Sequence, residues 1–142
     1  MKAIRHMGIV VSDIDKSLAF YVNLLGLKVK KDMLEQGSYI DNMLALKDVQ
    51  VRTVKMEADD GNLVELLWYK SHPRTRTHPN EICEIGASHV AFTVENLDAE
   101  YKRLSESGVE FNCPPQYSPD GKAKVTFCKD PDGTFIELVE ML

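Results

Sequence analysis

Two histidines and two glutamates occupy matching places in the two halves of the sequence. His6 begins a run of strand-like residues, and His89 begins a second such run 83 positions later. Glu65 and Glu137 lie in two similar segments that are 72 positions apart. Imidazole nitrogen and carboxylate oxygen together suit Zn, Ni, Co, Mn or Fe(II). The four residues are therefore candidate ligands of one divalent metal ion, with coordination positions left open for a substrate.

The neighbours of the glutamates strengthen this interpretation. Leu63 and Leu67 share a strand face with Glu65, and apolar residues flank Glu137 in the same way. A carboxylate among apolar neighbours needs a partner, and a cation would provide it. Taken singly, a strand histidine is more often an ordinary core or surface residue, and a glutamate more often a solvated charge. The repetition of all four residues favours a shared site.

The chain elements that must position these residues also repeat. A fixed internal offset is typical of two copies of one supersecondary unit. Asp13 and Asn96 correspond and are both residue types that cap helix starts. After each cap, apolar residues follow at the spacing of one helix face; they are Ile14, Leu18, Tyr21 and Leu25 in the first half and Leu97, Tyr101 and Leu104 in the second.

Each half is therefore predicted to have the order β-α-β-β-β, which gives an α+β fold. One domain, residues 1–142, is expected to consist of a module at 1–70 and a module at 86–142, joined by a polar, proline-broken linker at 71–85. The predicted elements of the first module are strands 4–11, 27–33, 49–57 and 62–69 with a helix at 13–25. The segment 38–46 is an additional candidate strand, beyond the four that this order requires. The predicted elements of the second module are strands 87–94, 109–112, 123–129 and 134–140 with a helix at 97–107.

Composition narrows the function classes. The 142 residues carry 17 Lys and Arg against 22 Asp and Glu, a net charge of −5 without a basic stripe, which argues against a nucleic-acid partner. The sequence has no long apolar run, so neither a membrane segment nor a signal peptide is predicted. Three cysteines without C-x-x-C spacing predict neither a disulfide framework nor a cysteine metal site. We expect a cytoplasmic protein.

Several short motifs carry a resemblance that covers nearly the whole chain. His6 is followed by Ser-Leu-Ala-Phe-Tyr at 17–21 and Leu-Gly-Leu at 25–27, and Lys-Asp-Pro-Asp-Gly at 129–133 leads into Glu137. In these motifs the chain resembles the vicinal-oxygen-chelate superfamily of glyoxalases, bleomycin-resistance proteins and dioxygenases. The resemblance implies two modules whose sheets curl around a metal-binding cleft, and it implies a homodimer.

The ligand set resembles one branch of that superfamily. His6, Glu65, His89 and Glu137 match position by position the ligands of metal-dependent glyoxalase I of the short bacterial type. Methylmalonyl-CoA epimerases usually carry Gln at the place of Glu65, whereas extradiol dioxygenases and fosfomycin-type thiol transferases have no ligand there. The bleomycin-sequestering members lack the whole set. Glu65 therefore favours isomerase chemistry.

The function implied is that of a divalent-metal-dependent lyase or isomerase similar to lactoylglutathione lyase. Its substrate would be a small carbonyl or thioester compound, with glutathione as a candidate cosubstrate. A proton would move beside a metal-bound carbonyl through an enediolate, with Glu137 or Glu65 as the base. The alternatives are an epimerase-like isomerase, an Fe(II) ring-cleaving dioxygenase, and a resistance or binding protein without catalysis.

Two further features have open interpretations. Arg5, Arg52, Arg74 and Arg76 are each either contacts for an anionic substrate or solvated surface residues. The segment 36–46 is either a substrate wall, a dimer contact or ordinary core.

Overall fold

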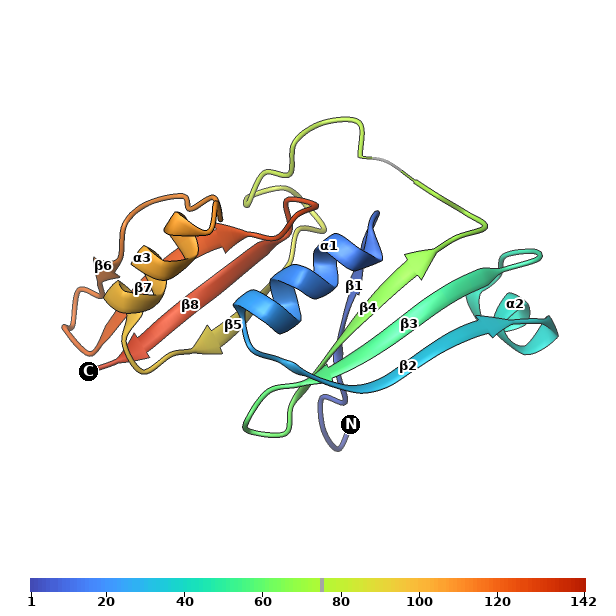
Figure 1. Ribbon diagram of the computed structural model, residues 1–142, viewed down its shortest axis with the longest axis horizontal. Helices are drawn as coiled ribbons and strands as arrows, with labels where there is room; N and C mark the ends of the chain where they lie inside the picture. The colour runs from blue at the N-terminus through green and yellow to red at the C-terminus, as the bar shows by residue number, and fades with distance from the viewer. Residues whose placement is uncertain (75) are drawn as a thin grey trace. The chain divides into compact units, whose positions relative to one another are not determined.

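Two four-stranded sheets, one in each half of the chain, form the framework of the protein. The computed structural model describes residues 1–74 and 76–142, which form two compact units, Met1–Arg76 and Thr77–Leu142 (Figure 1). The predicted linker 71–85 includes Thr75, which lies outside the described residues. Among the described residues, no helix has the length and apolar character needed to cross a membrane.

The sheet of the first unit has the strand order β1-β4-β3-β2. Strand β1 pairs with β4 in parallel, and the other neighbours are antiparallel. A helical segment follows β1, and a short helix lies between β2 and β3. The elements are β1 (Met7–Val10), α1 (Ile14–Leu18), η1 (Ala19–Leu24), β2 (Lys28–Gln36), α2 (Ser38–Leu44), β3 (Gln50–Glu57) and β4 (Leu63–Tyr69).

The second unit repeats this arrangement with the strand order β5-β8-β7-β6, and β5 pairs with β8 in parallel. Even the register repeats, because Gly8 lies opposite Glu65 in the first sheet and Ala91 opposite Glu137 in the second. The predicted α+β class with two β-α-β-β-β modules is confirmed. The elements are β5 (His89–Thr93), α3 (Leu97–Glu106), β6 (Gln116–Tyr117), β7 (Ala123–Lys129) and β8 (Phe135–Met141).

Alternation along the strands separates a core face from a more open face in each sheet. On β4 the core-facing residues Val64 and Leu66 are buried, and α1 contacts this strand. On β8 the corresponding residues Ile136 and Leu138 are buried, and α3 contacts that strand. The glutamates of both strands therefore lie on the opposite face.

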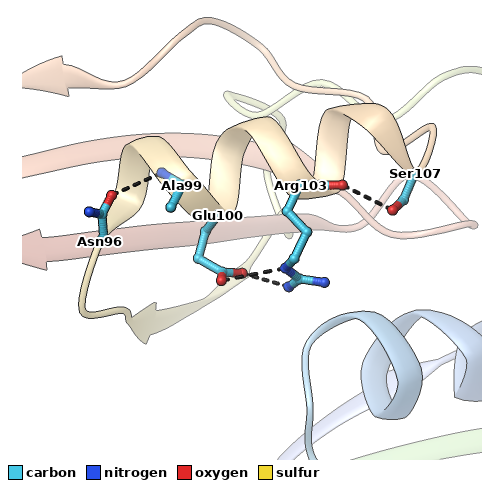
Figure 2. Close-up of polar contacts among 5 residues, drawn as sticks. All are labelled: Asn96, Ala99, Glu100, Arg103 and Ser107. Carbon is cyan, nitrogen blue, oxygen red and sulfur yellow. Dashed lines mark hydrogen bonds and ion pairs between the residues drawn. The ribbon is translucent and has the colours of Figure 1, made fainter.

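The predicted capping residues start both helices. The Asp13 carboxylate accepts the backbone N–H groups of Asp15 and Lys16, and the Asn96 side chain accepts that of Ala99. Figure 2 shows the Asn96 cap together with the Glu100 to Arg103 ion pair further along α3. These contacts satisfy backbone donors that have no partner within the helix.

The predicted helix 13–25 changes type along its length. It begins as the α-helix α1 and continues as the π-helix η1, in which the N–H of Leu25 donates to the carbonyl of Phe20, five residues earlier. The apolar residues Phe20 and Tyr21 are buried in this wider segment. The apolar spacing in the sequence does not reveal such a change, because a π-helical turn contains only about one residue more than an α-helical turn.

Two predicted strands are wrong, and one short strand was missed. Residues 38–46 were a candidate strand, but α2 is a helix that starts after Gly37, where φ is +96°. Its Ile40 and Leu44 lie one turn apart and pack against Val49 and Val51. The expected strand 109–112 is reduced to one bridge, between Phe111 and Cys128. The two-residue strand β6 was not predicted at all.

Candidate functional site

His6 and Glu65 form a close pair in the first unit. His6 directly precedes β1, and the parallel pairing of Gly8 with Glu65 places the histidine diagonally across from the glutamate on the same sheet face. Nε2 of His6 lies 2.9 Å from Oε2 of Glu65. Two residues that are 59 positions apart in the sequence are thus brought together by one strand pairing.

Glu65 has a second partner, Lys55, which the sequence analysis did not identify. Lys55 on β3 lies directly opposite Glu65, and its Nζ is 3.2 Å from Oε1. The Glu65 side chain is only 9% exposed, so the carboxylate is a buried group with one partner on each oxygen. The apolar neighbours of Glu65 led us to expect a partner for its carboxylate. His6 and Lys55 provide it.

One buried atom of this pair has no hydrogen-bond partner. Nδ1 of His6 is inaccessible to solvent, and the described residues provide no donor or acceptor for it. An unsatisfied buried polar atom costs about 1 to 3 kcal/mol. Packing alone does not explain this nitrogen.

His89 and Glu137 form the corresponding pair in the second unit. Nε2 of His89, the first residue of β5, lies 3.1 Å from Oε2 of Glu137 on β8. The Glu137 side chain is 22% exposed, more than that of Glu65. Phe127 on β7 lies opposite Glu137, and its ring packs edge-on against the His89 ring with centroids 5.3 Å apart. An aromatic ring thus takes the place that Lys55 has in the first unit.

The two pairs have the chemistry that a divalent ion requires. Two ligands that are each about 2.1 Å from an ion lie about 3.0 Å apart at the octahedral angle of 90° and about 3.4 Å apart at the tetrahedral angle. The separations of 2.9 and 3.1 Å fit the octahedral value, although a hydrogen bond has the same length. Within either unit, the described His, Cys, Asp and Glu residues do not gather as a group of three.

Arg52, which the sequence left open as a substrate contact, and the two remaining histidines, His72 and His78, lie in different surroundings. Arg52 makes two hydrogen bonds to Asp32 on the neighbouring strand, and these bonds lower the pKa of the Asp32 carboxyl. His78 is paired with Glu84 at 3.4 Å, and the ring of His72 contacts Ser71. These side chains already have polar partners, which favours their interpretation as ordinary surface residues.

The segment 36–46 combines two of its interpretations. Ile40 belongs to a buried cluster with Val49 and Val51, so this part is core. Tyr39 and Met43 on the same helix are exposed. The helix therefore closes one end of the sheet with one side and presents apolar residues with the other.

Comparison with known proteins gives consistent matches along the chain. Residues 3–138 match the model of the Glyoxalase/Bleomycin resistance protein/Dioxygenase superfamily. The uncharacterized protein YwkD of Bacillus subtilis is 32% identical, and the match covers 99% of this chain and 98% of that protein. The lactoylglutathione lyase of Schizosaccharomyces pombe is 29% identical over 96% of this chain, which spans 46% of that lyase.

Solved structures agree on the fold. The crystal structure of a glyoxalase family protein from Bacillus cereus superposes with a TM-score of 0.89, and the match covers 100% of this chain and 95% of the other. The two sequences are 24% identical, so this likeness is one of fold.

Proposed function

The chain belongs to the Glyoxalase/Bleomycin resistance protein/Dioxygenase superfamily, and on this basis we propose that it is a divalent-metal-dependent lyase or isomerase of the glyoxalase I type. The observation that carries the proposal is the pairing of one histidine with one glutamate at the same register position in each sheet. The match to a lactoylglutathione lyase supports the same reaction class.

The proposed ligands are His6, Glu65, His89 and Glu137, two imidazoles and two carboxylates. This set suits Ni, Zn, Co, Mn or Fe(II). When bound, the ion would act as a Lewis acid that stabilises negative charge developing on a substrate carbonyl. The two carboxylates would balance the charge of the ion, and coordination positions would remain for a small carbonyl or thioester compound.

Proton transfer is assigned to Glu137. Glu65 is held by a partner on each oxygen, whereas His89 is the one polar partner of Glu137 within the described residues. Glu137 is also the more exposed carboxylate. It would take the proton from the carbon beside the carbonyl and return it to the next carbon, so that no further reactant is consumed.

The first experiment is to purify the protein without chelator, determine bound metals by elemental analysis, and assay the Ni- or Zn-loaded protein with methylglyoxal and glutathione. We expect about one ion per site and measurable turnover. Metal without turnover would redirect the search to acyl-CoA epimers. Oxygen uptake with Fe(II) would favour a dioxygenase, and the absence of binding after reloading would contradict the metal site.

The base assignment has its own test. Glu137→Gln removes the proton acceptor while keeping a similar shape, so turnover should fall by at least about 100-fold with the metal still bound. Glu110→Gln is the matched control, because Glu110 in the same unit is an exposed residue paired with Lys129. An active E137Q enzyme would contradict the assignment.

The proposed assembly is a homodimer, as the family resemblance implies. Light scattering of the purified protein measures this directly.

A further inference from the structure

The two sheets differ at one position that the repeat makes equivalent. Lys55 lies opposite Glu65 on the neighbouring strand, and Phe127 lies opposite Glu137 in the same way. The offset between these two residues is 72, the same offset that relates the two glutamates. The modules therefore place a cation beside one glutamate and an aromatic ring beside the other.

Sheet stability does not account for the lysine. On its other side Lys55 lies opposite Lys31 of β2, and like charges directly opposite each other destabilise an antiparallel pair. The Nζ of Lys55 is instead 3.2 Å from Oε1 of Glu65, and its side chain is 28% exposed. The interaction with Glu65 is thus the favourable contact that offsets this repulsion.

The contact fixes the rotation of the Glu65 carboxylate. With Oε1 at Lys55, Oε2 is directed at Nε2 of His6, 2.9 Å away. Loss of Lys55 would leave Oε1 without its partner, and the carboxylate could then turn about its terminal torsion, which is a soft degree of freedom. Glu137 is not restrained in this way, because Phe127 offers no hydrogen bond.

We infer that Lys55 is a positioning residue of the proposed metal site, an inference that rests on the proposed function. Lys55 would hold Oε1 so that Oε2 stays directed toward His6 and available to the ion, which would keep Glu65 in place as a ligand. The difference between Lys55 and Phe127 thereby divides the roles of the two glutamates: Glu65 is a fixed ligand and Glu137 is the mobile base.

The decisive measurement is the affinity for Co²⁺, determined by competition with a chromophoric chelator. Partners behind metal ligands typically contribute 10- to 100-fold in affinity. We expect Lys55→Met to weaken Co²⁺ binding by about that factor, and Lys55→Arg, which keeps a charged donor, to recover most of it. The visible spectrum of bound Co²⁺ should change in Lys55→Met, because it reports the ligand geometry.

Lys30→Met is the matched control. Lys30 pairs with Glu57 at 3.0 Å on the same sheet, so this variant removes the same charge without touching Glu65. Its affinity should stay within about twofold of the wild type. Thermal unfolding of all variants checks that the fold is intact.

Two outcomes would overturn the inference, and they are distinguishable. In the first, the wild type binds Co²⁺ and Lys55→Met binds it equally or more tightly. Repulsion between Lys55 and the ion would then outweigh positioning, so the role inferred for Lys55 would be wrong while the metal site would stand. If neither Co²⁺ nor Ni²⁺ binds the wild type, the proposed function fails, and the inference fails with it.

Discussion

At the scale of single residues, the Cys128 thiol illustrates how burial controls reactivity. It is fully buried on β7, and desolvation, together with the charge of Asp130, raises its pKa to about 12. Cys83 and Cys113 are exposed. Because the thiolate is the reactive form, the three thiols should differ sharply in their chemistry.

We expect two fast thiols in a titration with a chromogenic disulfide at pH 8, and a third that reacts only after unfolding. Replacing Cys83 and Cys113 by Ser should remove the fast phase. Three fast thiols in the native protein would contradict the burial of Cys128.

The same thiol gives a pH dependence of stability. An unfolded Cys128 ionises near its ordinary pKa of 9.0, whereas the folded one retains its proton up to about 12. Between these values the native state binds more protons, so this residue's contribution to stability falls as pH rises. Urea unfolding from pH 8 to 11 should show a weaker decline in Cys128→Ala than in the wild type.

The candidate ligands could be identified from the sequence because the repeat supplies evidence that one residue lacks. His6, Glu65, His89 and Glu137 each have a counterpart, and the structure places each histidine beside its glutamate. Lys55 was missed because Phe127, its counterpart, has a different chemistry. Aligning the strands by the offset of 72 would have paired the two and exposed the substitution.

At the scale of elements, α2 is held by one side only. Ile40 is buried with Val49 and Val51, while Met43 on the same helix is exposed. Ile40→Ala should therefore lower the free energy of unfolding by about 2 to 5 kcal/mol. Met43→Ser should change it by less than about 0.5 kcal/mol. Urea denaturation measures both, and equal losses would contradict the packing described.

Long, periodic elements were predictable, and short ones were not. The strands at the four candidate ligands have four to seven residues and belong to longer apolar runs in the sequence. The caps Asp13 and Asn96 mark both long helical segments. A short, partly apolar segment such as α2 fits a helix and a strand equally well, and the tertiary contacts of Ile40 decide between them. The strand β6 has two residues, too few for any period.

At the scale of the whole molecule, the four proposed ligands are divided between the compact units Met1–Arg76 and Thr77–Leu142. An ion that binds only the folded protein raises the free energy of unfolding by about 2.7 kcal/mol when its free concentration is 100 times its Kd. For a chain of this size, Ni²⁺ should then raise Tm by roughly 5 to 10 °C.

Histidine variants test whether both units contribute. His6→Ala and His89→Ala should each abolish the Ni²⁺-induced rise in Tm, since each removes one proposed ligand. His78→Ala should retain it, because His78 is paired with Glu84. An undiminished Ni²⁺-induced rise in Tm in His89→Ala would show that His89 is not a ligand of the ion.

Strand β2 also has a consequence for the behaviour of the protein at high concentration. This nine-residue strand forms an outer edge of its sheet, where unpaired backbone groups could recruit a strand from another molecule. Lys28, Lys30 and Lys31 follow one another along this edge, and the register shifts between Val29 and Lys31. Edge lysines and an irregular edge both oppose strand addition, so we expect this edge to resist pairing with a strand of another molecule.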